Sequence, residues 1–351
     1  MQHFQRHWIE IFQFPHSEEI LSLYKSSSLL RNTMLAITAC HLRHVSPGIL
    51  QHRIAEHFQQ ALALRDYQTV LCLSQEHLDQ PSVDALFLSA MLLNILAFAL
   101  PQSETNHGEP DPTMSWVFSP REDRLNWLWL QMGLRPLLKS MSLYLDKTMS
   151  FLSRVFLGPG QEPTEFITIH HGLEGVPESW NKLLQLDGHN SGCDSKATSR
   201  PSDVTDTSPH PGDIFHAPVK IISMLRCLEP TGPNIFKSLV FLSKINGNFR
   251  TLLYNRDERA LWLFGYWLGL MCRFDGVWWC DKRVRMDYYG IYLWLSQVGL
   301  IERPGAEGQL WRELMMDLKI APTVNKHMAD NTVAISQQGH VSQHPGVLNL
   351  S

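Results

Sequence analysis

The residues most able to do chemistry in this chain are its 17 histidines. His41 and His44 stand three positions apart in a segment with helical periodicity, a spacing that could hold a metal ion. No carboxylate or cysteine lies near them in the sequence to complete a set of ligands, so core or interface histidines are the favoured interpretation. His3 and His7 stand four apart without the glutamate of an H-E-x-x-H motif, which argues against a zinc peptidase. We therefore predict no metal site.

The cysteines do not follow a zinc-binding pattern. There are six, at Cys40, Cys72, Cys193, Cys227, Cys272 and Cys280. No two are spaced C-x-x-C, so a binuclear zinc cluster is not expected from this sequence, and we predict no cofactor. Four of them (Cys40, Cys72, Cys227 and Cys272) lie in apolar helical surroundings, which predicts buried thiols in a reducing compartment.

Motifs of the common enzyme classes are absent from the sequence. It contains no G-x-S-x-G nucleophile elbow, no Walker loop and no G-x-G-x-x-G after a strand. The short Gly158-Pro159-Gly160 segment favours a plain turn over a phosphate-binding loop. The acidic residues are scattered, and no two can be paired for acid–base work from sequence alone. We predict that the protein is not an enzyme and assign no catalytic residue.

A basic group, Lys282, Arg283 and Arg285, stands beside two tryptophans and suggests a nucleic-acid-binding patch. From residue 257 to 287, however, five positive and five negative side chains cancel. The whole chain has a net charge of −4, whereas nucleic-acid-binding modules usually carry a basic excess. We therefore predict a solvated helix face with i,i+4 ion pairs, and no DNA-binding residue.

An aromatic and methionine-rich set of side chains could line a pocket for an apolar small molecule. Its members are Phe264, Trp267, Leu268, Met271, Trp278 and Trp279. Ordinary core packing explains the same pattern and is the favoured alternative. This set is the candidate ligand-binding site of the chain.

These residues belong to the stretch from 257 to 296, on which the rest of the chain is predicted to pack. Asp257 precedes an apolar run, as a helix N-cap should. Apolar residues then cover most of the helix circumference, which predicts a buried helix, and Gly265 and Gly269 would let another helix approach closely. The Asp-Gly pair at 275–276 predicts a turn. The two tryptophans and the basic group follow on a second helix, which completes an aromatic hairpin.

Helical periodicity predicts the other elements, and no segment alternates convincingly enough to predict a strand. Helices are expected near 18–25, 29–45, 51–73, 79–100, 121–145, 143–157, 218–228, 234–253 and 307–318. The helix from 121 is assigned from a capping box made of Ser119, Pro120 and Glu122. The predicted fold class is all-α, an irregular multi-helix bundle with an aromatic-rich C-terminal helical hairpin.

The domain organisation follows from length and composition. The chain has 351 residues, 44% of them hydrophobic, which suits one large helical domain. We assign residues 1–320 to it, with a polar insert near 187–213 that is predicted to be disordered and a flexible tail at 321–351. The longest apolar run, from Ala85 to Leu100, is shorter than the about 20 residues that span a bilayer. With no secretion signal at the N-terminus, a soluble intracellular protein is expected.

Four phrases of the sequence carry a family resemblance. They are RALWLFGYWLGLMCRFDGVWWC with the basic, aromatic segment after it, LLRNTMLAITACHLRHVSP, SVDALFLSAMLLNILAFA and SWVFSPREDRLNWLWLQMGLRPLL. From about residue 21 to 299 the chain resembles the C-terminal helical regulatory region of fungal zinc binuclear cluster (six-cysteine) transcription factors. The likeness is greatest to regulators of the sterol-uptake-control and secondary-metabolite type.

The resemblance implies a transcription regulator in the nucleus, acting on a biosynthetic (secondary-metabolite) or sterol-related set of genes. It also implies an apolar small-molecule ligand, and a homodimer or a heterodimer with other transcription regulators. Since the cysteines do not supply a zinc cluster, contact with DNA is expected to be indirect unless an N-terminal segment precedes this sequence. Dimerising with other factors or masking them is the expected mode of action, and no membrane partner is expected.

Two other interpretations of the sequence stay open. One is an all-helical small-molecule-binding protein, and the other is an all-helical enzyme of the same pathway. An enzyme predicts polar side chains that converge in a pocket, whereas a sensor predicts a pocket lined by aromatic, leucine and methionine side chains.

Overall fold

The computed structural model describes residues 2–74, 77–99, 110–157, 175–186, 211–232, 234–245 and 247–324, and within these ranges all regular secondary structure is helical. The predicted all-α fold class is confirmed. The first elements are α1 (Gln2–Arg6), α2 (Trp8–Phe12), α3 (Glu18–Ser26), α4 (Ser28–Val45), α5 (Leu50–Leu71), α6 (Gln80–Ala99), η2 (Pro112–Met114), α7 (Asn126–Ser140), η3 (Ser142–Tyr144) and α8 (Leu145–Leu157). The later ones are α10 (Glu178–Leu184), α11 (Pro211–Arg226), α12 (Asn234–Ser238), α13 (Val240–Lys244), α14 (Gly247–Tyr254), α15 (Glu258–Met271), α16 (Asp281–Gln297), η5 (Leu300–Glu302), α17 (Ala306–Ile320) and η6 (Ala321–Thr323).

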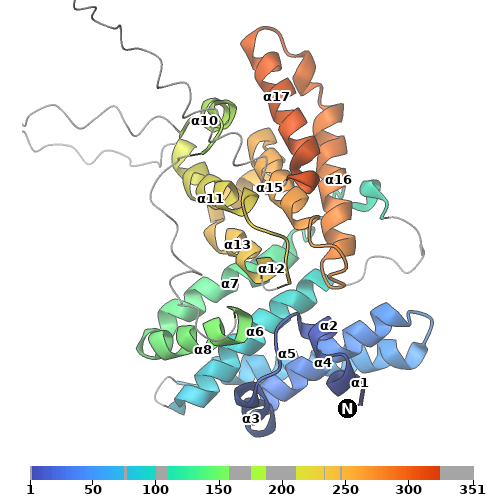
Figure 1. Ribbon diagram of the computed structural model, residues 1–351, viewed down its shortest axis with the longest axis vertical. Coiled ribbons are helices and arrows are strands. Elements are labelled where there is room, and N and C mark those ends of the chain that lie inside the picture. Colours follow the sequence, from blue (N-terminus) through green and yellow to red (C-terminus); the bar gives the residue numbers. More distant parts are fainter. Residues whose placement is uncertain are drawn as a thin grey trace, which may run out of the picture.

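The helices gather at two ends of the molecule. Figure 1 shows α1 to α5 at one end and α15, α16 and α17 at the other, with α6 and α7 between them. α4 and α5 pack along one another as an antiparallel pair. The buried Glu56 of α5 accepts hydrogen bonds from Arg43 of α4, and Asp66 accepts one from Asn32 at 2.8 Å. These polar contacts fix the register of the α4–α5 pair.

The helix α6 is long and apolar enough to cross a membrane by length and composition, and no other helix among the described residues is. In the fold, 78% of its most apolar window is buried against other elements. It contacts α4, α5, α7 and α8. The hydrophobic character of α6 is therefore accounted for by its place in the protein core. Its start follows the prediction, since Asp79 accepts a hydrogen bond from the backbone N–H of Ser82 at 3.0 Å.

The helix α15 is the most deeply buried element described. Twelve of its residues are buried, and α11, α14, α16 and α17 contact it. Figure 1 shows α11, α16 and α17 next to α15. Asp257 caps its first turn, as predicted, by accepting from the backbone N–H groups of Arg259 and Ala260. Gly265 and Gly269 allow the close approach that the sequence predicted, because a Cβ on either would meet a side chain of α16 at 3.0 Å or less. The fold is thus organised around α15.

The helix predicted from residue 121 begins five residues later, at Asn126, so the capping box was wrong. In a capping box the glutamate accepts from the N–H of the capping serine. Here the N–H of Ser119 donates instead to the carbonyl of Trp116 at 3.1 Å. The Ser119 carbonyl in turn accepts from Arg256 at 3.0 Å. A local turn therefore uses the N–H of Ser119 and a tertiary contact uses its carbonyl, and the segment forms turns in place of the first turns of a helix.

Other boundaries also differ from the prediction, among them the start of α11, at Pro211 where 218 was predicted, and the end of α7, at Ser140 where 145 was predicted. The single helix expected over 234–253 is broken into α12, α13 and α14. The break exposes the carbonyl of Ser238, which accepts from the indole of Trp267 at 2.9 Å. Trp278 and Trp279 precede α16 and lie in the turn that connects it to α15. The Asp-Gly turn itself is confirmed, with Gly276 in the left-handed region at φ +75°.

Some predictions fall outside the described residues. These are the turn at 158–160, most of the insert near 187–213 and most of the tail at 321–351. The parts of the last two that are described, residues 211–213 and 321–324, lie in α11 and at the end of the fold around η6. The assignment of residues 1–320 to one domain stays a prediction.

We expect the substitution Gly269→Ala to destabilise the protein by about 1–3 kcal/mol, the usual effect of overpacking a core. The new Cβ would lie 2.7 Å from the Cβ of Ala321, which is held by its own backbone. Gly48→Ala is the matched control, because Gly48 has no atom within 4 Å of an added Cβ. Urea unfolding followed by tryptophan fluorescence measures both. An equal change in the two variants contradicts the packing argument.

Candidate functional site

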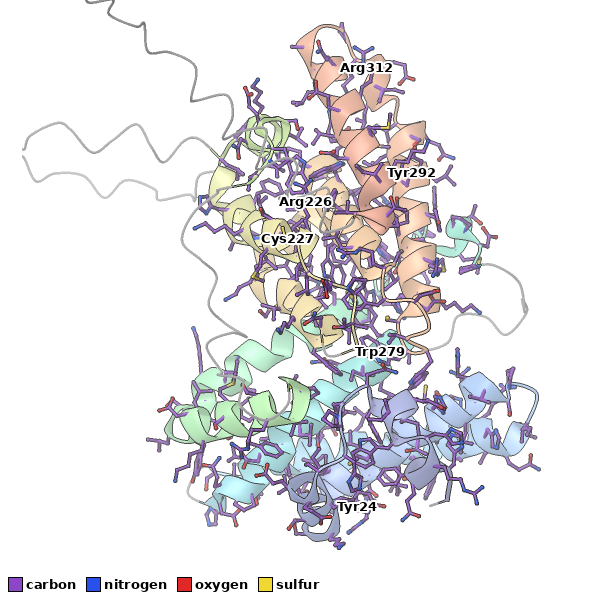
Figure 2. The ribbon with its side chains drawn as sticks, viewed as in Figure 1. Tyr24, Arg226, Cys227, Trp279, Tyr292 and Arg312 are labelled. Atoms are coloured by element: carbon purple, nitrogen blue, oxygen red, sulfur yellow. The ribbon has the colours of Figure 1, made fainter. Side chains whose placement is uncertain are left out.

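The structure separates the six predicted ligand-binding residues into two places. Phe264, Trp267, Leu268 and Met271 lie on α15 and, like Trp279, are almost completely buried. Trp278 is only partly buried and packs towards the N-terminal helices. Figure 2 shows Trp279 at the junction between the C-terminal helices and the N-terminal ones. Whether these residues bind a ligand stays a prediction.

Around Phe98, at the end of α6, aromatic rings from four parts of the chain pack together. The ring centroid of Phe98 lies 5.0 Å from that of Trp127, 5.8 Å from that of Trp279 and 6.3 Å from that of Trp267. Phe264 joins the same group and contacts Trp116, Trp127 and Trp267 at 6.2, 6.3 and 5.3 Å. We call these residues the Phe98 cluster: Phe98, Trp116, Trp127, Phe264, Trp267 and Trp279. It includes three of the six residues predicted from sequence.

Three indole N–H groups of the Phe98 cluster have no hydrogen-bond acceptor in the part of the chain that the structure describes. They belong to Trp116, Trp127 and Trp279, and each indole nitrogen is shielded from solvent. Buried tryptophans normally find an acceptor for this group. Trp267, in the same cluster, does so by donating to the carbonyl of Ser238. An unpaired buried donor costs about 1–3 kcal/mol, so three in one cluster call for a bound molecule or ordered water that accepts from them.

A buried carboxylate lies next to the cluster. Asp287 of α16 is fully buried, and its Oδ1 accepts a hydrogen bond from the hydroxyl of Ser115 at 2.8 Å. Its Oδ2 has no hydrogen-bond partner among the described residues. Burial raises the pKa of Asp287 to about 6, and the charge of Arg283 and hydrogen bonds from Ser115 and the backbone N–H of Trp116 oppose that rise. The site therefore offers one unsatisfied acceptor beside three unsatisfied donors.

Arg283 links this carboxylate to the aromatic rings. Its Nε donates to the carbonyl of Phe98 at 3.0 Å, and its guanidinium lies 5.2 Å from the ring centroid of Trp127. Burial lowers the pKa of Arg283, and the charge of Asp287 opposes that effect. The prediction of a solvated face was therefore wrong for Arg283. It holds for Arg285, whose Nε donates to Asp281 at 2.6 Å in an i,i+4 ion pair.

The short segment that carries Ser115 and Trp116 is held tightly against α16. A Cβ on Gly290 would lie 2.4 Å from the Cβ of Ser115 and 2.8 Å from the carbonyl oxygen of Pro112. Only glycine lets η2 and the residues after it approach α16 this closely. Gly290, Ser115 and Asp287 together position the indole of Trp116.

His3, His41 and His44 lie elsewhere, where the N-terminal helices meet Trp278. His41 is buried, as predicted, and its Nδ1 lies 3.0 Å from Nε2 of His3 in a hydrogen bond. Burial lowers the pKa of His41 to about 4, helped by the neighbouring His3 and His44. The indole of Trp278 donates to the carbonyl of Ile11 at 3.1 Å. Among the described residues, no group of three or more possible ligands is placed to hold a metal ion.

The cysteines correct one prediction. Cys40 is buried and Cys272 is half-buried, but Cys72 and Cys227 are exposed. Each exposed thiol follows the last residue of a helix, Cys72 after α5 and Cys227 after α11, so the apolar pattern before it does not extend to the cysteine. Cys280, which was not assigned, is buried in the turn before α16.

Comparison with protein-family models, with curated proteins and with solved structures finds no match. The functional argument therefore rests on the residues of this chain and on their geometry.

Phe98, Trp116, Trp127 and Asp287 were missed as site residues from sequence. Trp116 and Trp127 belong to a phrase that carried the family resemblance, yet nothing in their spacing brings them to Phe264. Asp287 stands four residues after Arg283, a spacing that predicts an exposed ion pair. In the structure both side chains instead turn towards the core. The one signal in the sequence was Asp287 itself, a carboxylate on a predicted helix that is rich in aromatic residues.

We expect Trp262→Phe to destabilise the protein more than Trp279→Phe does, by about 1–2 kcal/mol. Both substitutions remove a similar ring volume from a buried site. Trp262, however, donates to the carbonyl of Leu314 at 2.8 Å, whereas the indole of Trp279 has no acceptor. Chemical unfolding of the two variants compares them. Equal losses of stability show that an acceptor pairs with the Trp279 N–H in solution.

We expect Asp287→Asn to stabilise the protein near neutral pH. A carboxyl whose pKa is raised on folding stabilises the fold most when protonated, and that contribution is lost as pH rises from about 4 to 6. The loss amounts to about 3 kcal/mol above pH 6, and asparagine removes it. Unfolding free energies from pH 4 to 8 give the difference between variant and wild type, which grows with pH and then levels. The exposed Asp146→Asn is the control, and a difference independent of pH contradicts the argument.

Proposed function

We propose that this protein is a transcription regulator whose helical domain responds to an apolar small molecule bound in the Phe98 cluster. One observation carries the ligand part, namely the three buried indole donors that lack acceptors. The resemblance of the chain to the regulatory region of fungal six-cysteine factors supports the gene-control part. By that resemblance the protein acts in the nucleus, on a secondary-metabolite or sterol-related gene set.

The chemistry of the cluster favours a particular kind of ligand. Its body is apolar, to suit the rings of Phe98 and Phe264. It carries carbonyl or hydroxyl oxygens that accept from the indoles of Trp116, Trp127 and Trp279. A hydroxyl group could also donate to the free Oδ2 of Asp287. Oxygenated sterols and polyketides have these properties.

A change in packing caused by ligand binding in the cluster can be transmitted to the surface of the protein through neighbouring helices. The cluster joins α16, through Arg283, to the end of α6 at Phe98. The helix α6 packs on α4 and α5 in turn. A ligand that binds one packing of α16 against α6 more tightly than another shifts the protein towards that state. The surface of α5 is where such a shift would be sensed.

The outer face of α5 supports a protein partner. Leu50, Ile54 and Phe58 stand four residues apart in succession, and each side chain is about 60% exposed. A row of large apolar side chains on a surface helix is typical of protein–protein contact. We propose that the partner is a second copy or another transcription regulator, through which the protein acts on DNA.

A second candidate function rests on Asp287. A buried carboxylate with a raised pKa beside Ser115 and Arg283 is also a feature of enzyme active sites. The alternative is therefore a helical enzyme or binding protein of the same pathway. Formation of a product from an oxygenated sterol or polyketide by the purified protein, with loss of turnover in Asp287→Asn, would favour it.

The test of the proposed regulator is a reporter assay. The chain is fused to an unrelated DNA-binding domain in a fungal cell, and reporter output is measured with and without oxygenated sterols and polyketides. We expect reporter output to depend on the ligand. The Trp127→Phe variant should need about tenfold more ligand for the same output, because one hydrogen bond to the ligand is lost. Arg312→Gln, on the exposed side of α17, is the control.

Thermal shift of the purified protein with the same compounds separates the two parts of the proposal. Reporter output without any thermal shift contradicts the ligand-binding part of the proposal and supports the regulator part. A thermal shift with a silent reporter supports ligand binding and contradicts the regulator part. Neither response, in a fusion that accumulates in the nucleus, overturns the proposal as a whole.

A further inference from the structure

A second group of unsatisfied donors lies on the other side of α15, away from the Phe98 cluster. The hydroxyl of Tyr266 is fully buried, and its O–H has no acceptor among the described residues. The Nε of Arg226, at the last turn of α11, is shielded from solvent and likewise has no acceptor in that part of the chain. The guanidinium of Arg226 lies 5.9 Å from the ring centroid of Tyr266. The guanidinium of Arg226 also approaches the oxygen of the Tyr266 hydroxyl as a hydrogen-bond donor. Among the described residues, however, neither the O–H of Tyr266 nor the Nε–H of Arg226 has an acceptor.

The surroundings of this pair are aromatic. Trp180 of α10 lies under the guanidinium of Arg226, at 5.1 Å from its ring centroid. The Trp180 ring meets those of Tyr266 and Trp262 edge-on, at 4.7 and 4.9 Å. Stacking holds the plane of an arginine fork while leaving its N–H groups available. No hydrogen bond or ion pair to an acidic side chain engages the guanidinium of Arg226 in the described part of the chain.

The local charge balance is positive. Burial raises the pKa of the Tyr266 hydroxyl, and the charge of Asp317 adds to that rise. The charges of Arg226 and Arg273 and a hydrogen bond from Arg226 oppose it. Arg273 is occupied, because it donates to backbone carbonyls of residues 225, 226 and 228. Asp317 is occupied as well, accepting from the indole of Trp180 at 2.9 Å. Two cations and one anion leave a net charge of +1 around Tyr266.

We propose that Arg226 and Tyr266 form a binding site for the carboxylate of a small aromatic or aliphatic acid. A carboxylate accepts two parallel hydrogen bonds from an arginine fork, and its remaining lone pairs accept from a hydroxyl such as that of Tyr266. One negative charge balances the net charge of +1. The rings of Trp180 and Trp262 suit an apolar body attached to the carboxylate. This site is separate from the Phe98 cluster and does not depend on the function proposed above.

The ligand approaches from the end of α11. Arg226 is half-buried, and the next residue, Cys227, is exposed. Figure 2 shows the two side by side at the end of α11. The guanidinium of Arg226 is therefore nearer to solvent than the buried hydroxyl of Tyr266.

Inorganic phosphate is the main competitor by charge. It carries up to two negative charges near neutral pH and has no apolar body, so it matches neither the net charge of +1 nor the aromatic walls. A preference for benzoate over phosphate thus distinguishes a carboxylate site from a general anion site.

The test uses the full chain and sodium benzoate, with sodium phosphate and sodium chloride at matched ionic strength. Tryptophan fluorescence and thermal unfolding report binding, since Trp180 lies against Arg226. We expect benzoate, and neither of the other salts, to raise the unfolding temperature in a saturable way. Arg226→Gln should weaken benzoate binding by at least about tenfold, the usual effect of losing a charged hydrogen bond. Arg226→Lys should weaken it as well, because lysine has no fork.

Tyr266→Phe separates binding from folding. It removes a buried O–H that has no acceptor among the described residues, so the free protein should keep or gain stability while its response to benzoate falls several-fold. Arg312→Gln, whose side chain is exposed on α17, should leave benzoate binding unchanged. The proposal is overturned if phosphate or chloride stabilises as well as benzoate does, if no salt has an effect, or if Arg226→Gln responds like the wild type.

Discussion

The burial of α15 along all but its first two residues is the constraint on which the rest of the structure depends. A helix with apolar side chains around its whole circumference must be covered on every side. In this protein α11, α14, α16 and α17 provide the cover, although they lie on both sides of α15 in the sequence. The covering requires close approach, which Gly265 and Gly269 permit at the contact with α16. It also requires large side chains to fill the space between helices, and tryptophan and phenylalanine do so.

A core filled with tryptophan needs hydrogen-bond acceptors, because each indole carries an N–H group. The acceptors in this fold are mainly backbone carbonyls that have no partner within a helix. Trp267 uses Ser238 at the break after α12, and Trp278 uses Ile11 in the N-terminal segment. Trp180 uses the carboxylate of Asp317. The breaks in the helical pattern are therefore part of how the aromatic core is satisfied.

The sequence was sufficient to predict what local rules control. The Asp257 cap, the close-approach glycines of α15 and the turn at Gly276 follow from propensity and spacing, and all are present. The predictions that were wrong concern residues whose contacts are with distant parts of the chain. The helix expected from residue 121 is displaced because Arg256 uses the carbonyl of Ser119. Arg283 turns into the core because the end of α6 offers it a carbonyl and a ring. The six predicted ligand-binding residues were close in sequence, and the structure keeps only three of them in the Phe98 cluster.

Two of the unpaired indoles of that cluster, those of Trp127 and Trp279, have a common explanation in competition for acceptors. The last carbonyls of a helix have no partner within it, so the end of α6 is a natural source of acceptors for nearby N–H groups. The carbonyl of Phe98 is one of them, and Arg283 takes it with a charged donor. A charged donor competes better than a neutral indole does, since its hydrogen bonds are about twice as strong. The indoles of Trp127 and Trp279, both in contact with Phe98, are left without a partner. Arg283 thereby keeps their donors available, and a molecule that brings its own oxygen atoms can satisfy them without disturbing the contact between α16 and α6.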